Sequence, residues 1–352
     1  MTADDYRQWL LRAICSQKLP ILTRDRDFDA FRERRRWAGE QLLHLHVMSL
    51  ARTTLPNVAV MTIGGQGRLI GQELAWQFLK SDFDEKQIVE TCGLYFVLLA
   101  CVDHLMDDQP GGWERLRPVW NPDAIEQALN LGCARNGGTD DVVDVGCDSD
   151  IHTVSLLTAS FFSQCRNLAG NEWGNVLWTQ FSNAVWQAFH AQNLNAESNR
   201  FSFQPLAKIR GSLRGKSVYP TQILGMIPLL SRSAREVAVS GNLEEILSLF
   251  GVMGKIFGLV DDLADLPQDL MRGQMNETVL SYLESKPDNF IYNSSAPIPM
   301  EVLVSEGYVE TIIRTLSKDL EHFNRMASRV MPRPDRFFDE VCLWLRSGLN
   351  LQ

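Results

Sequence analysis

A run of apolar residues that ends in three aspartates constrains the fold of this chain more than any other feature. Leu94 to Val102 are all apolar, and Asp103, Asp107 and Asp108 follow with no Gly or Pro between them to indicate a surface turn. On a helix, Asp103 and Asp107 project from one face about one turn apart, and Asp108 is turned away by about 100°. Like charges this close repel each other unless a cation lies between them. The segment therefore predicts an apolar helix that ends either in a solvated turn or at a cation.

A second segment repeats the pattern. The apolar stretch "LFGVMGKIFGLV" (249 to 260) runs into Asp261, Asp262 and Asp265, which spell D-D-x-x-D. Asp261 and Asp265 share a helix face at i, i+4, and Asp262 lies within reach of Asp265 at i, i+3. Below, residues 103–108 are called the first aspartate segment and residues 261–265 the second. Two such helix ends are far rarer by chance than one.

Paired carboxylate segments of this kind suit the handling of a diphosphate by Mg²⁺. Magnesium prefers oxygen ligands, keeps several waters, and is held by one or two carboxylates plus phosphate oxygens of a substrate. The two segments could hold a small cluster of Mg²⁺ ions around a departing diphosphate, and an apolar cavity beneath them would hold a hydrocarbon. The predicted metal-binding and catalytic residues are Asp103, Asp107, Asp108, Asp261, Asp262 and Asp265.

The remaining sequence predicts an all-α protein. Apolar residues recur at three-to-four spacing, and alternating strands with hairpin turns are hard to find. We expect a single all-α domain over residues 1–352, with loops at 136–150 and 284–300. The expected helices are 27–50, 66–80, 84–108, 151–168, 172–195, 220–230, 242–265, 299–328 and 335–348.

Composition excludes several functional classes. The chain has 352 residues, 45% of them hydrophobic and 22% charged, which is globular and sufficient for a large core. A net charge of -9 argues against general nucleic-acid binding, and the basic run "RDRDFDAFRERRR" contains enough acids to favour a solvated helix face. The seven cysteines are scattered without metal-site spacing. We expect a soluble, cytoplasmic protein with no membrane span and no signal peptide.

The paired aspartate segments resemble those of the trans-isoprenyl diphosphate synthase and class I terpene synthase superfamily. "GKIFGLVDD" (254 to 262) is similar to the family's G-x-x-F-Q-x-x-D-D, with Gly258 where Gln is usual. "GKSVYPTQILG" (215 to 225) resembles a Lys-Thr segment that kinks a helix beside the site. "DLMRGQMNETVL" (269 to 280) falls where the family has a Gly-Lys segment. The resemblance covers roughly residues 60 to 285.

The resemblance implies a fold, a cofactor and a set of site residues. It implies an isoprenoid-synthase helical bundle with a central apolar cavity, a Mg²⁺ cofactor, an allylic prenyl diphosphate substrate and often a homodimer. The residues expected to contact the diphosphate are Lys216, Arg210, Arg214 and Arg272. The residues expected to line the pocket are Tyr95, Phe96, Leu98, Leu99, Trp178, Phe181, Trp186 and Phe257. Aromatic faces stabilise cations, although a stripe such as Trp178, Phe181, Val185 and Phe189 is more often plain core.

The departures from the family narrow the predicted reaction. Chain-elongating members hold isopentenyl diphosphate with a Gly-Gly-Lys-Arg-x-Arg-Pro segment and an Arg-Arg-Gly, whereas this chain has "GGQGRLIGQ" (64 to 72) and "QPGGWERLRPVW" (109 to 120). A second diphosphate needs several fixed arginine forks, and most are missing here. His104 stands where the family has a second aspartate, and we expect it to hydrogen-bond a neighbour rather than a metal.

These observations favour a terpene synthase that ionises an allylic diphosphate and cyclises or rearranges the carbocation. A prenyltransferase using isopentenyl diphosphate or another acceptor is the alternative, with Arg68, Arg115, Arg117 or the arginines at 32–36 as cations. A third possibility is an inactive subunit of a prenyl synthase, although the intact second aspartate segment and Lys216 argue against it. Asp140, Asp141 and Asp144 also spell D-D-x-x-D, but the surrounding glycines favour an acidic loop.

Overall fold

Every regular element of the structure, which is a computed structural model, is a helix. The described residues are 1–22, 25–42, 51–52, 54–79, 84–109, 111–131, 149–170, 176–198, 206–231, 243–286 and 298–349. Within these ranges no residue lies in a β-strand, which confirms the predicted all-α class.

The chain divides into two compact units, each built from separate stretches of sequence. Unit 1 consists of residues 1–28, 183–223 and 242–352, and unit 2 of residues 29–182 and 224–241. Unit 1 contains α1 (Ala3–Ser16), η1 (Pro20–Leu22), α12 (Leu243–Arg272), α13 (Glu277–Glu284), α14 (Met300–Ser305), α15 (Tyr308–Val330) and α16 (Pro334–Gly348). Unit 2 contains α4 (Asn57–Phe78), α5 (Glu85–Asp103), the π-helix η3 (His104–Asp108), α6 (Gly112–Leu116), α7 (Pro122–Leu131) and α8 (Ser149–Ala169). Both units take residues from α2 (Asp25–Leu42), α9 (Val176–Ser198) and α10 (Leu206–Leu230).

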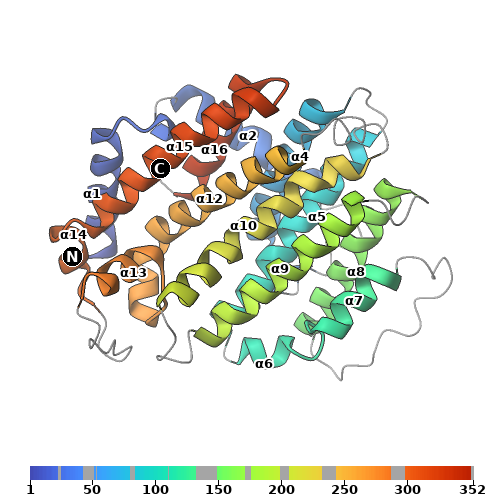
Figure 1. The fold of residues 1–352 in the computed structure, drawn as a ribbon, viewed down its shortest axis with the longest axis horizontal. Coiled ribbons are helices and arrows are strands. Elements are labelled where there is room, and N and C mark those ends of the chain that lie inside the picture. The colour runs from blue at the N-terminus through green and yellow to red at the C-terminus, as the bar shows by residue number, and fades with distance from the viewer. Residues whose placement is uncertain are drawn as a thin grey trace. The chain divides into compact units, whose positions relative to one another are not determined.

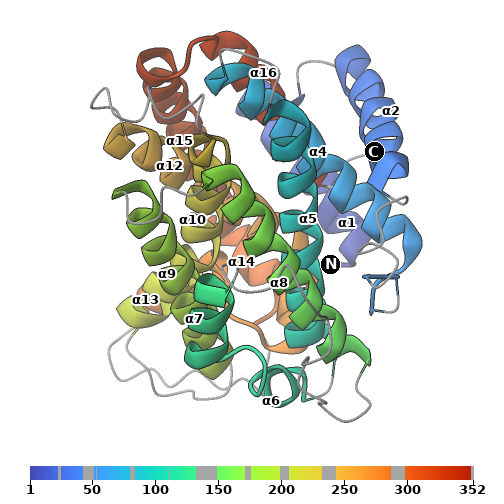
Figure 2. The same cartoon turned by 90° about the vertical axis from the view of Figure 1, so that its right-hand side faces the viewer.

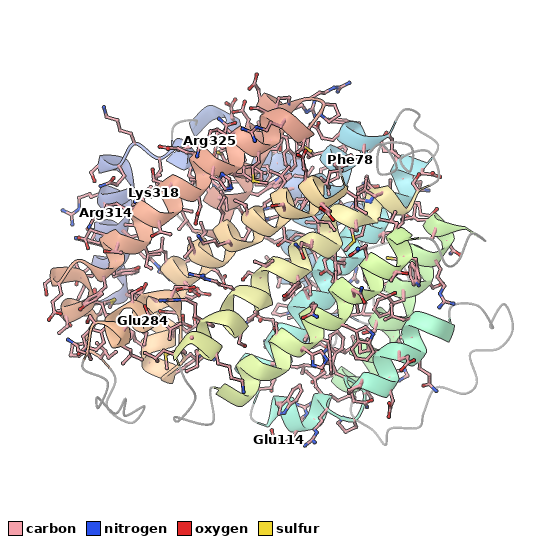
Figure 3. The ribbon with its side chains drawn as sticks, viewed as in Figure 1. Phe78, Glu114, Glu284, Arg314, Lys318 and Arg325 are labelled. Carbon is pink, nitrogen blue, oxygen red and sulfur yellow. The ribbon has the colours of Figure 1, made fainter. Side chains whose placement is uncertain are left out.

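Unit 1 is built around α12. Figure 1 shows α15 running alongside α12, and α16 packs against both helices. The Phe337 ring of α16 lies between those of Phe250 on α12 and Phe323 on α15, with centroid distances of 6.1 and 5.8 Å. Charged side chains occupy the opposite side of α15, where Figure 3 places Arg314, Lys318 and Arg325 along one outer face. This division of faces is what an amphipathic surface helix requires.

Unit 2 is built around the close packing of α4 against α5, which lie side by side in Figure 2. Three glycines of α4 face α5. A Cβ atom added at Gly67 would stand 2.6 Å from the Cys92 carbonyl oxygen, and one at Gly71 would stand 2.8 Å from the Cys92 Cβ. A Cβ at Gly64 would stand 2.4 Å from Leu42 Cδ1 of α2 and 3.0 Å from Val97 Cγ2 of α5. The two backbones approach closely only because these positions carry no side chain.

The structure corrects several helix boundaries. α4 begins at Asn57 and α10 at Leu206, so both are longer than predicted at their N-terminal ends. The predicted helix 299–328 is two helices, α14 and α15, because Gly307 adopts a left-handed φ of 80° between them. Helices α1, α6, α7 and α13 were not predicted.

The predicted loops lie mostly outside the described residues, as do Asp140, Asp141 and Asp144. At the loop edges, Asp150 already belongs to α8, Glu284 to α13 and Met300 to α14, so both predicted loops are too long. Among the described residues, one segment, Glu85–Met106, is long and apolar enough to cross a membrane. A share of 61% of its apolar window is buried, and core helices of soluble proteins meet the same test.

Replacing Gly67 with alanine tests the packing of α4 on α5. The added Cβ would meet backbone atoms that cannot move aside, so we expect the free energy of unfolding to fall by about 1–3 kcal/mol. Gly211→Ala is the matched control, because a Cβ there meets nothing within 4 Å and the same change in an open helix stabilises by about 0.5–1 kcal/mol. Chemical denaturation measures both; equal stabilities for the two variants would contradict the close packing.

Candidate active site

The second aspartate segment lies in the second half of α12, a helix of 30 residues. The preceding turns are anchored by core residues, among them Met253, Ile256 and Val260. Asp261 and Asp265 are exposed and, being four residues apart on an α-helix, share one face. The two carboxylates thus share an exposed face inside α12, which continues to Arg272 rather than ending at residue 265 as predicted.

Asp262 is turned toward a neighbouring helix. Its Oδ2 atom accepts a hydrogen bond from the Glu277 N–H at 2.8 Å, at the first residue of α13. Burial, together with the charges of Asp261, Asp269 and Glu277, raises the pKa of Asp262 well above its usual range, while the Glu277 N–H opposes that rise. Asp262 thus satisfies one of the backbone donors that a helix N-terminus leaves without a partner.

The turn after α12 explains how α13 comes to face Asp262. Gly273 adopts a left-handed φ of 64° at the end of α12, a backbone geometry that glycine supplies without strain. Asn276 then caps α13: its side-chain oxygen accepts from the Val279 N–H at 3.0 Å. The same side chain donates through Nδ2 to Asp269 Oδ2 at 2.9 Å. Asn276 therefore holds the turn to α13 on one side and to α12 on the other.

Two of the four predicted diphosphate contacts are ion-paired within the protein. The Nε atoms of Arg210 and Arg214 donate to the two carboxylate oxygens of Glu277, at 3.0 and 3.1 Å. Arg210 also pairs with Glu284, which Figure 3 labels on α13. Burial opposes the charge of Arg210, but the Glu284 and Glu277 carboxylates outweigh it and raise its pKa. Contact of either arginine with a diphosphate stays a prediction.

Lys216 lies on a part of α10 that packs closely against α12. A Cβ added at Gly254 would stand 2.5 Å from the Ser217 carbonyl oxygen, and one at Gly258 would stand 2.7 Å from Ser217 Oγ. Gly258 therefore makes room for α10 one turn before Asp261. This packing brings the half-buried Lys216 next to the turn that precedes the second aspartate segment.

Arg272, the fourth predicted diphosphate contact, is exposed in the last turn of α12. With the Gln268 amide oriented to satisfy both groups, its oxygen accepts hydrogen bonds from the two terminal nitrogens of Arg272 at 2.7 and 2.9 Å. The guanidinium is thereby held along the helix that carries the aspartates.

The first aspartate segment changes helix type, which the sequence analysis did not anticipate. Asp103 is exposed at the end of α5, and residues His104–Asp108 form a π-helix. Hydrogen bonds in a π-helix run over five residues rather than four, so the position one turn after Asp103 shifts from residue 107 toward residue 108. The side chains of Asp107 and Asp108 lie outside the described part, and their metal role stays a prediction.

Neighbouring residues support this widened turn. His104 Nε2 and Gln109 Nε2 form a hydrogen bond at 3.2 Å, in agreement with the expectation that His104 bonds a neighbour. Gly111 adopts a left-handed φ of 67°, and a Cβ at Gly112 would stand 1.4 Å from the Leu105 carbonyl oxygen. The glycines after the first aspartate segment are thus needed for the backbone itself.

Gly65 and Arg115 lie in the two segments where most arginines for a second diphosphate are missing, and both contact other residues of unit 2. Gly65 lies inside α4, where a Cβ would stand 2.2 Å from the Arg35 carbonyl oxygen of α2. Arg115 Nη2 donates to Asp150 Oδ2 at 3.2 Å, and Thr54 donates to the other oxygen of that carboxylate at 3.0 Å. Burial lowers the pKa of Arg68, while the charge of Glu90 opposes this shift. Arg117 is exposed.

The arginines at 32–36 include two that lie over a ring of their own helix. Arg34 and Arg35 stand 6.0 and 5.8 Å from the centre of the Phe31 ring.

Several predicted pocket residues belong to a buried aromatic stack in unit 2. Phe161, which the sequence analysis missed, stacks on Tyr95 at 4.8 Å and lies 6.4 Å from Phe181. Trp178 stacks on Phe181 at 5.1 Å. Tyr95, Phe161 and Phe181 are at most 3% exposed, so this group packs as core. Leu98 is buried as well, whereas Phe96, Leu99, Trp186 and Phe257 are half-buried.

The second aspartate segment fits Mg²⁺ in its chemistry, although its three carboxylates do not converge. Among the side chains that the structure describes, no group of three or more His, Cys, Asp or Glu is arranged to hold a metal. The reason within this segment is that Asp262 bonds α13 while Asp261 and Asp265 lie on the exposed face. Two carboxylates with solvent and phosphate oxygens are nevertheless a sufficient ligand set for Mg²⁺.

Glu277 and Asn276 are the main site residues that sequence reasoning missed. Asn276 lies three residues after Gly273 and is followed directly by Glu277. An Asn before an acidic first helical residue is a helix-start signal, and here it marks the start of α13. The ion pairs of Glu277 with α10 carry no such local signal.

The variant Asp262→Asn tests the electrostatics of this segment. Because the folded state raises the pKa of Asp262, it binds the proton more tightly than the unfolded state, so stability falls as pH rises above about 3.9. Asparagine keeps an oxygen for the Glu277 N–H and removes the charge. We expect metal-free Asp262→Asn to be more stable than the wild type at pH 8, with a gap that shrinks toward pH 4.

Thermal unfolding in EDTA across that pH range measures the gap, and Asp335→Asn, at an exposed site on α16, is the control. A less stable Asp262→Asn at pH 8 would show that the charge itself is stabilising.

Comparisons with known proteins identify the fold. No protein-family model matches the sequence, and no curated protein matches it. Among solved structures, the geranylgeranyl pyrophosphate synthetase of Geoglobus acetivorans matches with a TM-score of 0.58 and 12% identity, over 89% of this chain and 98% of that one. The corresponding synthetase of Pyrococcus horikoshii has a TM-score of 0.56 at 12% identity, over 92% and 98% of the two chains. The heptaprenyl diphosphate synthase of Staphylococcus aureus has a TM-score of 0.56 at 12% identity, over 88% and 98%. The chain therefore shares the fold of these three synthases.

Proposed function

We propose that this protein is a Mg²⁺-dependent enzyme that acts on an allylic prenyl diphosphate by releasing its diphosphate group. One observation carries the proposal: Asp261 and Asp265 are exposed on one face of α12 directly after its apolar stretch, and Lys216 lies on the helix packed against the preceding turn. Carboxylates for metal and a cation for phosphate are the groups that this chemistry requires. The fold shared with prenyl diphosphate synthases supports the same substrate class.

Each group has a defined task in the proposed reaction. Asp261 and Asp265 would hold Mg²⁺, which when bound neutralises the charge that develops on the diphosphate as its C–O bond breaks. Lys216 would bind phosphate oxygens directly. Asp262 would act mainly by holding α13 against α12. Half-buried Phe257, one turn before Asp261, would contribute to an apolar wall that keeps water from the allylic cation.

Transfer of the allylic cation to an acceptor such as isopentenyl diphosphate is the first candidate for the subsequent step. The support is that the three similar solved structures named above are described as prenyl diphosphate synthases. The comparisons thus favour the alternative of the sequence analysis over its main interpretation.

Cyclisation or rearrangement by a terpene synthase is the second candidate, and particular residues favour it. Arg115 is paired with Asp150 and Gly65 packs against α2, so neither resembles a prepared second diphosphate site. We propose a cytoplasmic homodimer as the form of the enzyme. An inactive subunit of a prenyl synthase is the third alternative, and the second aspartate segment and Lys216 argue against it.

The direct test is turnover of defined substrates with and without isopentenyl diphosphate. Purified protein with Mg²⁺ receives farnesyl, geranylgeranyl or geranylfarnesyl diphosphate, and products are analysed by mass spectrometry. We expect diphosphate release from at least one substrate. Longer prenyl diphosphates formed only with isopentenyl diphosphate indicate transfer, whereas a hydrocarbon or alcohol formed without it indicates cyclisation.

Variants show whether that turnover depends on the second aspartate segment. Asp261→Asn and Asp265→Asn should each lower turnover by at least about a hundredfold, since loss of even an outer partner of a metal ligand costs 10–100-fold. Asp335→Asn on α16 should leave it unchanged. Full turnover in both site variants, or no product from any substrate together with no Mg²⁺-dependent binding of an unreactive analogue, would overturn the proposal.

A further inference from the structure

Pro267 interrupts the hydrogen bonding of α12 beside the second aspartate segment. It lies inside the helix, and because proline has no N–H, the carbonyl of Leu263 four residues earlier loses its helical donor. Leu263 is 0% exposed. A carbonyl at such a buried position needs another partner, since leaving it unpaired costs as much as a lost hydrogen bond.

Tyr6 supplies the missing donor. Its hydroxyl donates to the Leu263 carbonyl oxygen at 2.8 Å, and its side chain is 0% exposed. Tyr6 belongs to α1, which packs against α12 and α15 within unit 1 (Figure 1). A side chain from the first helix of the chain thus completes the backbone bonding of a helix that begins more than two hundred residues later.

The surroundings of Tyr6 keep it a donor. Burial raises the pKa of its hydroxyl, and the carboxylates of Asp269 on α12 and Glu310 on α15 raise it further. The phenol therefore stays protonated at neutral pH. The Trp9 ring stacks on Tyr6 at 6.2 Å and limits its movement.

The hydrogen bond from Tyr6 to Leu263 lies within the second aspartate segment. Leu263 stands between Asp261 and Asp265, and proline bends a helix over the turn that precedes it. The relative direction of those two carboxylates depends on that bend. We propose that Tyr6 is a positioning residue for the second aspartate segment: its hydroxyl replaces the hydrogen bond that Pro267 removes and fixes the geometry of Asp261 and Asp265.

A double-variant cycle in the full-length protein tests this pairing. Pro267→Ala restores an N–H that reaches the Leu263 carbonyl, so the Tyr6 hydroxyl should matter only while Pro267 is present. The proteins are the wild type, Tyr6→Phe, Pro267→Ala and Tyr6→Phe/Pro267→Ala. Tyr308→Phe is the matched control, because its hydroxyl bonds Ser285 in an exposed contact away from α12.

Hydrogen exchange of the peptide covering residues 259–267 is the first measurement. We expect Tyr6→Phe to speed exchange about tenfold, the equivalent of one lost hydrogen bond, and Tyr308→Phe to leave it unchanged. In the Pro267→Ala background, the Tyr6→Phe change should alter exchange by less than about twofold on the same grounds. Equal acceleration in both backgrounds would mean that Tyr6 acts by general packing, and would overturn the pairing.

Mg²⁺-dependent binding of an unreactive farnesyl diphosphate analogue is the second measurement, and it rests on the proposed function. Tyr6→Phe should raise the half-saturating Mg²⁺ concentration about tenfold, again the equivalent of one hydrogen bond, and should not do so beside Pro267→Ala. Unchanged Mg²⁺ dependence in Tyr6→Phe would overturn the positioning role. If the wild type binds no analogue, the proposed function and the positioning role fail together, while the exchange cycle still decides whether Tyr6 pairs with the Pro267 gap.

Discussion

The second half of α12 carries four aspartates directly after a buried apolar stretch, and its neighbours are arranged around that charge. Asp261 and Asp265 reach the exposed face, which lets solvent or cations stabilise them. Asp262 instead accepts the Glu277 N–H, and Asp269 accepts the Asn276 amide. Buried carboxylates need such partners, because desolvation otherwise disfavours their charged form. The fold thus separates the acids into an outward pair and an inward pair.

Helix α13 connects the aspartates of α12 to α10. Glu277 bonds Asp262 through its backbone and Arg210 and Arg214 through its side chain. Gly254 and Gly258 let α10 approach α12 directly, so the two helices are connected both by contact and through α13. A diphosphate that recruited either arginine would compete with Glu277. We propose Lys216, on the same stretch of α10, as a phosphate contact.

The sequence predicted the parts of this architecture that depend on local pattern. The apolar spacing that leads into Asp103 and Asp261 specified two buried helices correctly, because helix periodicity is encoded residue by residue. It did not specify the π-helix after Asp103, since Gly112 packing on Leu105 is a tertiary effect. Nor did it reveal that Arg115 pairs with Asp150 or that Tyr6 bonds Leu263. Those contacts join distant segments, and single-sequence patterns carry no information about them.

The shared fold leaves the reaction to be decided by the site, since one fold hosts many chemistries. Our central proposal is that Asp261 and Asp265 hold Mg²⁺ against a diphosphate. The most direct measurement is a crystal structure of the protein with Mg²⁺ and an unreactive farnesyl diphosphate analogue. It should show Mg²⁺ bound by Asp261 and Asp265 and by diphosphate oxygens, with Asp262 still accepting the Glu277 N–H. A diphosphate bound away from these two carboxylates would contradict the account.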